Sequence, residues 1–360
     1  MKASWIKYPL QFKFKAGTSR GVLTTKKSYF VFIKDETNTI GVGECSLLPG
    51  LSIDDRPDTE QQLEKICERL RQLTINNIKG MSAFLEEEIG NVWPSLRMGF
   101  ETAFLDYLQG GKRVVFKNDF LKGEGIPING LIWMGDRQFM LHQIKEKIES
   151  GYSCIKIKIG ALDFDAELDL LQQVRKQFSV SDLNIRVDAN GAFSFYEAMG
   201  KLGQLEKLKV HSIEQPIKAG QWEKMYELCQ NTPVPIGLDE ELIGENNIER
   251  KKDLLRRIRP QYIILKPSIL GGFYATREWI DVAESLGISW WITSALESNI
   301  GLNAICQFTH GLGVTREQGL GTGQLFSNNI DAPLEVVQGY IQYSQNRKWD
   351  LSNLGIQSIQ

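Results

Sequence analysis

The sequence has few of the residues that most metal sites, disulfide frameworks and acid–base catalysts use. Only three histidines and five cysteines occur among 360 residues. The cysteines lie far apart and form no C-x-x-C pair, so we expect neither a disulfide framework nor a zinc site, and a reducing cytoplasm is the expected compartment. Acid–base and metal chemistry must therefore depend mainly on lysine, aspartate and glutamate.

Long hydrophobic runs and an excess of one charge are also missing. The 42 lysines and arginines nearly balance the 44 aspartates and glutamates, for a formal net charge of −2 at pH 7. Such a chain has no electrostatic attraction to nucleic acid or to an anionic membrane. No apolar run approaches the roughly 18 residues of a membrane span, and residues 1–7 show no signal-peptide pattern. We expect neither a nucleic-acid nor a membrane partner.

Residues 1–120 have the pattern of a small α+β domain. Aromatic and β-branched residues partly alternate in three segments and predict antiparallel strands there: 3–16, 29–36 and 39–46. Helical periodicity follows at about 57–75 and 94–109. Strands followed by helices are typical of an α+β domain.

Residues 126–326 instead repeat a short strand, a charged residue and a helix. Five strand cores end at a charge: Lys158, Asp188, Glu214, Asp239 and Lys266. Their spacings of 30, 26, 25 and 27 residues are the length of one βα unit. Further strands fit at 126–133, 288–293 and 318–322. The pattern predicts a closed barrel of about eight parallel strands, and we expect the tail, 327–360, to pack on the first domain.

Three carboxylates end successive strands of this barrel. Active sites of such barrels lie at the C-terminal ends of the strands, so Asp188, Glu214 and Asp239 should converge there. Carboxylates held close together repel unless a cation lies between them. Ligation by oxygen alone selects a hard ion, Mg²⁺ first and Mn²⁺ as the alternative. The competing interpretation is that each carboxylate caps a helix or forms an ordinary ion pair.

Lysines flank the carboxylates on both sides. Side chains alternate along a strand, so Lys156 and Lys158 share one face, and in a parallel barrel that face is the interior rather than solvent. Lys266 should face Lys158 across the barrel. Neighbouring cations lower the pKa of an ammonium, so one lysine could act as a base near pH 7. A base beside a metal-bound carboxylate suggests removal of the proton α to that carboxylate.

Five short motifs carry these residues: Lys156-Ile157-Lys158, Asp188-Ala189-Asn190, Glu214-Gln215-Pro216, Leu238-Asp239-Glu240 and Leu265-Lys266-Pro267. Their order and spacing resemble the enolase superfamily, in its muconate-lactonising-enzyme subgroup, over essentially the whole chain. The resemblance implies an α/β fold, a (β/α)7β TIM-like barrel with an N-terminal α+β capping domain that the tail completes. It also implies that the three carboxylates hold Mg²⁺ and that Lys158 and Lys266 are catalytic, on opposite faces of the substrate.

Three loops resemble the o-succinylbenzoate synthase family in particular: 48–52, 267–272 and 294–301. That family's reaction implies a small-molecule carboxylate substrate, 2-succinyl-6-hydroxy-2,4-cyclohexadiene-1-carboxylate, which loses water to become 2-succinylbenzoate in menaquinone biosynthesis. By the resemblance, Lys158 takes the α-proton and helps the hydroxyl to leave, while Lys266 stabilises the enediolate as a cation.

Further residues are expected around the substrate. We expect Lys156, Asn190 and Ser294 to bind it, and Gly50 and Leu51 to cover it as part of a lid from the capping domain. We expect Arg186 and Glu240 to support the site from behind, Arg186 as an ion pair lower in the barrel. Each loop also has an ordinary interpretation as a turn or a helix cap.

Two alternatives to this function stay open. Two lysines on opposite faces also suit a racemase of N-acylamino acids or a dipeptide epimerase. The epimerases usually carry a D-x-D motif after the seventh strand, and residues 294–298 contain no aspartate. A non-catalytic barrel that only binds its ligand predicts the loss of a metal ligand or a lysine, and all five residues are present. The sequence carries no signal for an oligomeric state.

Overall fold

The computed structural model describes residues 1–18, 21–160 and 163–356. Its N-terminal strands form an antiparallel sheet in the order β1-β2-β3: Lys2–Thr18, Gly21–Lys34 and Ile40–Ser46. The strand expected at 29–36 is longer than predicted, since β2 begins at Gly21. Its first half is polar in sequence, yet Lys26 is only 1% exposed and donates to Ser28 and Ser46, so tertiary packing rather than local pattern extends this strand.

Helices cover one face of this sheet: α1 Thr59–Arg71, α2 Ile78–Phe84, the π-helix Leu85–Ile89 and α3 Pro94–Leu108. The helix α3 lies directly on β3, where glycines allow backbone contact. A Cβ atom on Gly43 would lie 1.8 Å from the carbonyl oxygen of Gly99. Only glycine at this crossing lets the helix and the strand approach so closely.

In the described part of the chain, seven strands form a parallel sheet in the order β11-β10-β9-β8-β7-β6-β5. They are β5 Gly130–Ile132, β6 Cys154–Lys158, β7 Asn184–Asp188, β8 Ser212–Glu214, β9 Ile236–Leu238, β10 Tyr262–Leu265 and β11 Ser289–Ile292. The strand expected at 318–322 is reduced to two parallel bridges, Ile128 with Gln318 and Thr293 with Gly319. These bridges connect the two edges of the sheet and close the barrel.

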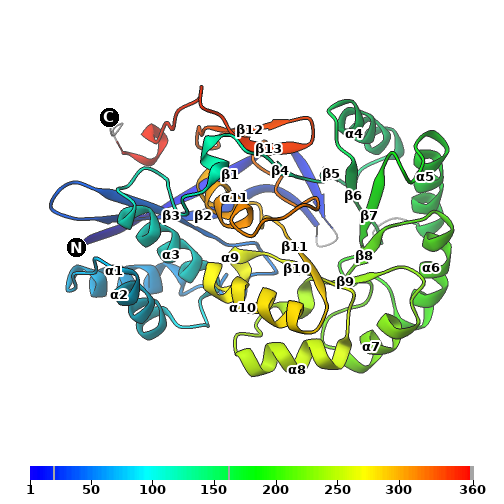
Figure 1. The fold of residues 1–360 in the computed structure, drawn as a ribbon, viewed down its shortest axis with the longest axis horizontal. Coiled ribbons are helices and arrows are strands. Elements are labelled where there is room, and N and C mark those ends of the chain that lie inside the picture. The colour runs from blue at the N-terminus through cyan, green and yellow to red at the C-terminus, as the bar shows by residue number, and fades with distance from the viewer. Residues whose placement is uncertain (19–20, 161–162, 357–360) are drawn as a thin grey trace.

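The barrel helices form an outer layer, which Figure 1 shows as the arc from α4 to α7 around the strands. Their bounds are α4 Arg137–Glu149, α5 Phe164–Gln177, α6 Phe195–Lys207, α7 Trp222–Asn231, α8 Ile248–Ile258, α9 Pro267–Leu270, α10 Gly272–Ser285 and α11 Asn299–His310. None of the described helices combines the length and the apolar character needed to cross a bilayer.

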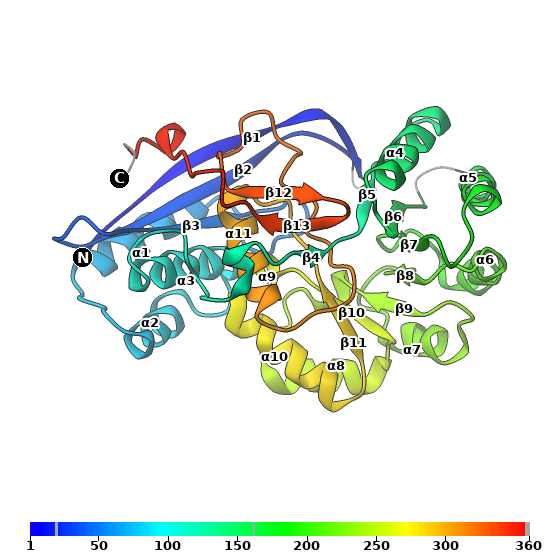
Figure 2. The same cartoon turned by 45° about the horizontal axis from the view of Figure 1, so that its top comes forward.

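The C-terminal tail returns over the N-terminal sheet. Its strands β12 Leu334–Val337 and β13 Tyr340–Tyr343 pair with β4 Ile126–Pro127 in the order β12-β13-β4, as Figure 2 shows. Beyond them, Leu351 packs with Phe30 of β2. The long hairpin of β1 and β2 crosses the molecule in the same view and reaches β5 and α4, where Gly17 bridges to Met134.

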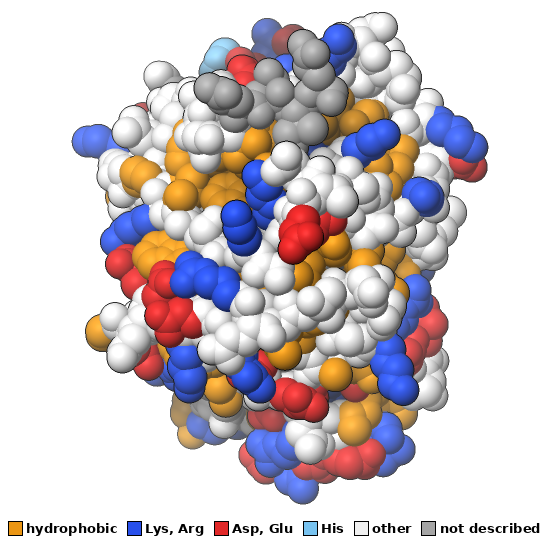
Figure 3. Space-filling model, turned by 90° about the vertical axis from the view of Figure 1, so that its left-hand side faces the viewer, with side chains coloured by type: hydrophobic (Ala, Val, Ile, Leu, Met, Phe, Trp, Pro, Cys, Tyr) orange, Lys and Arg blue, Asp and Glu red, His pale blue; other side chains and the backbone are white. Residues whose placement is uncertain are grey.

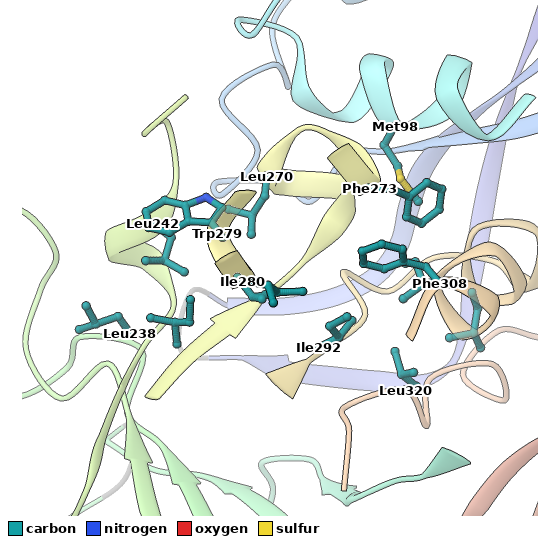
Figure 4. Close-up of a cluster of buried hydrophobic side chains, with 14 of the residues drawn as sticks. Met98, Leu238, Leu242, Leu270, Phe273, Trp279, Ile280, Ile292, Phe308 and Leu320 are labelled. Atoms are coloured by element: carbon teal, nitrogen blue, oxygen red, sulfur yellow. The ribbon is translucent and has the colours of Figure 1, made fainter. Parts of the chain in front are cut away.

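The hydrophobic core continues from the α+β layer into the barrel. Figure 4 shows Met98 of α3, Phe273 of α10 and Phe308 of α11 packed beside Ile292 of β11. Each of these side chains is at most 7% exposed. The burial fixes β10 and β11 against the capping helices, and these strands carry Lys266 and the loop that begins at Thr293.

Two buried carboxylates of the N-terminal domain cap barrel helices. Glu44 of β3 accepts hydrogen bonds from the backbone N–H groups of Ser298 and Gly301, both at 3.0 Å, at the start of α11. Glu101 of α3 accepts from Phe273 N–H at 2.8 Å, at the start of α10. Carboxylates satisfy the free N–H groups at a helix N-terminus and its dipole, so these contacts join the two parts of the chain.

Burial raises the pKa of Glu101 to about 7, against roughly 4.3 for an unfolded glutamate. Between these values the folded state binds more protons than the unfolded state, so stability falls as pH rises from about 4.3 to 7. We expect Glu101→Gln, which stays uncharged, to gain about 3 kcal/mol relative to the parent between pH 5 and pH 8. Thermal unfolding midpoints should show a relative gain of about 4 °C. Glu149→Gln, at a carboxylate 64% exposed, should show none; a pH-independent difference for Glu101→Gln would contradict the prediction.

Charges of both signs are mixed over the face in Figure 3, which views the side that carries the N-terminal sheet and its helices. Lysines and arginines there alternate with aspartates and glutamates. This distribution agrees with the near-zero net charge.

Candidate active site

A cavity of about 320 Å³ lies between the C-terminal ends of the barrel strands and the capping domain. Its wall comes from β2, the loop after β3, the barrel strands β5, β6 and β7, and the loops after β10 and β11. The described lining residues are Leu23, Leu48, Pro49, Gly50, Asn129, Leu131, Trp133, Lys156, Lys158, Asp188, Asn190, Lys266, Thr293, Ser294, Leu296, Gly319, Gly321 and Thr322.

Most of the site residues expected from the sequence meet here. Lys156, Lys158, Asp188, Asn190, Lys266, Ser294 and Gly50 line the cavity. Glu214 and Asp239 lie just behind it, at 3% and 2% exposure, and contact the lysines. Leu51, Arg186 and Glu240 are not among the described lining residues.

Lys156 lies between two of the three carboxylates. Its Nζ is 2.9 Å from Asp188 Oδ2 and 2.6 Å from Glu214 Oε2. The strand register places Asp188 and Glu214 as direct neighbours across β7 and β8, with Lys158 beside Asp188 on β6. Lys156 lies two residues earlier on the same face of β6 and reaches both carboxylates from there. Burial alone would raise the pKa of Asp188, but Lys156 and Lys158 lower it below its usual range. Burial and the charge of Asp188 raise the pKa of Glu214 to about 8.

Lys158 is held by Asn190. The Lys158 ammonium donates to Asn190 Oδ1 at 2.8 Å and to Asp188 Oδ2 at 3.3 Å. The amide of Asn190 in turn donates from Nδ2 to Glu240 Oε1 at 3.0 Å. The residues Asn190 and Glu240 thus orient Lys158, because the amide of Asn190 connects the lysine to Glu240. The expected contact of Asn190 with substrate stays a prediction.

Lys266 forms an ion pair with Asp239 on the other side of the cavity. Gln215 fixes the backbone there, because its Oε1 accepts from the N–H groups of Asp239 and Glu241. Burial alone would lower the pKa of Lys266, but Asp239, Glu214 and Glu240 raise it above its ordinary value. A raised pKa agrees with the role expected for Lys266, which is that of a cation.

The three carboxylates pair with lysines instead of surrounding a common centre: Asp188 and Glu214 share Lys156, and Asp239 pairs with Lys266. Among the described residues, no three Asp, Glu, His or Cys side chains are grouped so that they could hold one ion. Their chemistry nevertheless fits a hard cation, since all donors are oxygen and come from consecutive strands. Glu214 Oε1 is buried and, within the described chain, has no hydrogen-bond partner. A bound cation would supply a partner for this oxygen.

The Ser294 hydroxyl faces the cavity but is fully used by the protein. It donates to Glu297 at 2.5 Å and accepts from Leu296 N–H at 2.9 Å and from the Thr322 hydroxyl at 2.7 Å. These bonds use its one proton and both acceptor lone pairs. The hydroxyl therefore holds Leu296, whose φ is +62°, at the cavity wall instead of offering a free group to substrate.

The expected lid reaches the cavity at Gly50. Its φ is +73°, a conformation that glycine adopts without strain. Leu51 is not among the described lining residues, and it packs against the small apolar cluster that contains Leu48 and Trp133. The backbone of Leu48 is fixed by Ser52, because the Leu48 N–H donates to Ser52 Oγ at 2.9 Å.

Arg186 lies lower in the barrel. Its guanidinium donates to the Glu317 carbonyl at 2.8 Å, lies 3.7 Å from the Glu317 carboxylate and stacks 4.2 Å from the Trp291 ring. These contacts place it as an internal ion pair below the cavity.

Several lining residues were not expected from the sequence. Leu131 and Trp133 follow the alternation of the strand predicted at 126–133, so period 2 could have placed them on the interior face. Leu23 comes from the polar half of β2. Thr293 forms a bridge with Gly319, and the Thr322 hydroxyl donates to Ser294. No local sequence pattern indicates either of these contacts.

The chain is similar in sequence to known enzymes. Residues 140–347 match the family described as enolase C-terminal domain-like. The chain is 46% identical over 367 aligned positions to the o-succinylbenzoate synthase of Desulfotalea psychrophila (strain LSv54 / DSM 12343), covering 96% of this chain and 99% of that relative. It is 28% identical over 222 positions to the L-Ala-D/L-Glu epimerase of Francisella tularensis subsp. novicida (strain U112), covering 61% of each.

Solved structures share the fold. The crystal structure of MenC from Desulfotalea psychrophila LSv54 has a TM-score of 0.86 at 42% identity, covering 95% of this chain and 99% of that one. The muconate lactonizing enzyme from Pseudomonas fluorescens complexed with muconolactone has a TM-score of 0.82 at 21% identity, covering 98% and 97%. The second likeness shows the fold alone. The expected α/β class, a TIM-like barrel with an N-terminal α+β capping domain, is confirmed.

Proposed function

The chain belongs to the o-succinylbenzoate synthase family of the enolase superfamily, and we propose that the cavity between Lys158 and Lys266 is where it carries out that family's reaction. The reaction is the dehydration of 2-succinyl-6-hydroxy-2,4-cyclohexadiene-1-carboxylate to 2-succinylbenzoate, in menaquinone biosynthesis, so the chain is a hydro-lyase. The observation that carries the proposal is the convergence of both lysines and Asp188 on one cavity.

Enzymes of the enolase superfamily generally use Mg²⁺, and Asp188, Glu214 and Asp239 are the residues that would hold it here. The support is the all-oxygen donor set from three consecutive strands and the unpartnered Glu214 Oε1 of the described chain. When bound, the cation supplies positive charge beside the substrate carboxylate as negative charge accumulates on it.

Lys158 and Lys266 have different tasks. The Lys158 amine removes the proton α to the ring carboxylate, and the electrons of that C–H bond move toward the carboxylate. The C–OH bond then breaks as Lys158 returns a proton to the hydroxyl on the same face, so one water leaves. Lys266 stays protonated on the opposite face, where its charge stabilises the intermediate. Asn190 and Glu240 support this arrangement because they hold the Lys158 ammonium in place.

The charges around the cavity favour an anionic substrate over a dipeptide. Among the described lining residues, Lys156, Lys158 and Lys266 are cationic and Asp188 is the one carboxylate. For the α-ammonium of a dipeptide, the described wall offers only Asp188, which already pairs with Lys156 and Lys158. The loop after β11 has no aspartate over residues 294–298, where the epimerases usually carry a D-x-D motif. Dehydration therefore fits this cavity better than dipeptide epimerisation.

Turnover tests the proposed function directly. Purified protein with Mg²⁺ should convert the substrate to 2-succinylbenzoate, followed by the absorbance of the aromatic product, and EDTA should stop the reaction until Mg²⁺ is restored. In deuterated water, dipeptides should gain no α-deuterium. Absence of product together with α-deuterium in N-acylamino acids or dipeptides would favour the racemase or epimerase alternative instead.

Gly50 provides a test of the lid. We expect Gly50→Pro to raise KM at least about tenfold, since proline cannot adopt a φ near +73° and the loop must leave the cavity wall. Mg²⁺ affinity by calorimetry should not change. Gly313→Pro imposes the same conflict, at φ +67°, in a turn outside the cavity wall and should leave KM unchanged. A parent-like KM for Gly50→Pro would contradict the lid assignment, as would a product complex with the 48–52 loop more than about 7 Å from the product, beyond contact range.

We also propose that the chain forms two domains. The first is the capping domain of residues 1–120, which residues 327–360 complete, and the second is the catalytic barrel of residues 126–326. The support is the packing of Leu351 with Phe30 of β2 and the two hydrogen bonds, both of 2.8 Å, that the Tyr8 hydroxyl and the Gln11 N–H of β1 donate to Asn328 in the tail.

A further inference from the structure

The ring of Trp133 forms part of the cavity wall and is held on two sides. Trp133 directly follows β5 and is 4% exposed. Its ring lies edge-on to those of Phe12 and Phe14 in β1, with centroid distances of 6.3 and 5.6 Å and interplanar angles of 76° and 69°. Edge-to-face pairs stabilise aromatic rings beyond their burial, so the N-terminal hairpin fixes the orientation of this indole.

The backbone of Trp133 is held by one side chain of α4. The ladder between β5 and β6 ends at Ile132, so the next peptide groups need other partners. Gln143 Oε1 accepts from Trp133 N–H at 2.9 Å, and Gln143 Nε2 donates to the Trp133 carbonyl at 3.0 Å. A single amide thus takes the place of a neighbouring strand and satisfies two backbone groups that would be costly to leave unpaired.

The indole belongs to the apolar side of the cavity. Its neighbours there are Leu48, Leu131 and Leu296, while the other lining groups include the lysines. We propose that Trp133 determines specificity by packing against the ring and methylene groups of the substrate, and that Gln143 is a positioning residue that acts through Trp133. This inference rests on the proposed function, because it assumes a substrate with both an anionic and an apolar part.

A double-mutant cycle tests the inference. We compare Trp133→Ala, Gln143→Ala, the double variant and the parent by KM, kcat and the calorimetric affinity for 2-succinylbenzoate with Mg²⁺. Trp133→Phe keeps a ring against Phe14 and serves if the alanine variant does not fold. His142→Ala is the matched control, because this neighbour on α4 is 69% exposed.

Trp133→Ala should raise KM and weaken product binding at least about tenfold, with kcat changed less than about threefold. Gln143→Ala should change the same quantities by about three- to tenfold, and the double variant should resemble Trp133→Ala because Gln143 acts through the ring. Trp133→Phe should lie between parent and Trp133→Ala, and His142→Ala should match the parent. Parent-like KM in both Trp133 variants, or additive effects in the double variant, would overturn the inference. Failure of the parent itself to turn over substrate would instead refute the proposed function.

Discussion

Replacing Lys158 by alanine is expected to lower kcat by about 10³- to 10⁴-fold with little change in KM. The reason is that one amine both removes the α-proton and protonates the departing hydroxyl, so both proton transfers are lost. The fold should survive, since Asp188 keeps Lys156 as a cationic partner at 2.9 Å. Initial rates of product formation, with circular dichroism as a check of folding, measure the effect.

A surface lysine provides the comparison for this variant. Lys145→Ala removes a lysine that is 74% exposed on α4 and should retain the parent kcat. Full turnover by Lys158→Ala would contradict the assignment of the base, whichever substrate is correct.

Glu214→Ala should abolish turnover and weaken Mg²⁺ binding at least about 100-fold. Loss of a residue that only supports a ligand typically costs 10- to 100-fold in metal affinity, and Glu214 is proposed as a ligand itself. Without metal the fold should persist, because the variant removes a buried carboxylate that lies beside Asp188 and so relieves repulsion between like charges. Titration calorimetry with Mg²⁺ measures the affinity, and thermal unfolding without Mg²⁺ tests the fold.

Glu317→Ala is the matched control for this variant. Glu317 is also a carboxylate paired with a cation of a barrel strand, Arg186, but its side chain is 20% exposed and does not line the cavity. Its loss should leave Mg²⁺ affinity unchanged. If Glu214→Ala bound Mg²⁺ as tightly as the parent, the assignment of the metal ligands would be wrong.

The barrel could be predicted because its signal is local and periodic. Each strand core is a short run of β-branched residues that ends in a charge, as in Ile185 to Asp188, and the run recurs about once per βα unit. Strand direction then places all the charges at one end of the barrel. The structure brings Lys158, Asp188 and Lys266 to one cavity for this reason.

Features that depend on distant contacts were not predictable in this way. The polar first half of β2 suggests a loop. In the structure, however, Lys26 is buried and its ammonium donates to a serine hydroxyl on each of two strands, β2 and β3. Ser294 looks like a free hydroxyl in sequence, whereas Thr322, 28 residues away, occupies one of its lone pairs. Likewise, the two hydrogen bonds between the Gln143 side chain and the Trp133 backbone depend on the position of α4 beside β5. Sequence periodicity does not specify that position.

A crystal structure with Mg²⁺ and 2-succinylbenzoate tests the central claim most directly. We predict the product ring between Lys158 and Lys266, its ring carboxylate beside a cation held by Asp188, Glu214 and Asp239, and its apolar part against Trp133. A product bound outside this cavity, or a cation held by other residues, would contradict the proposed site.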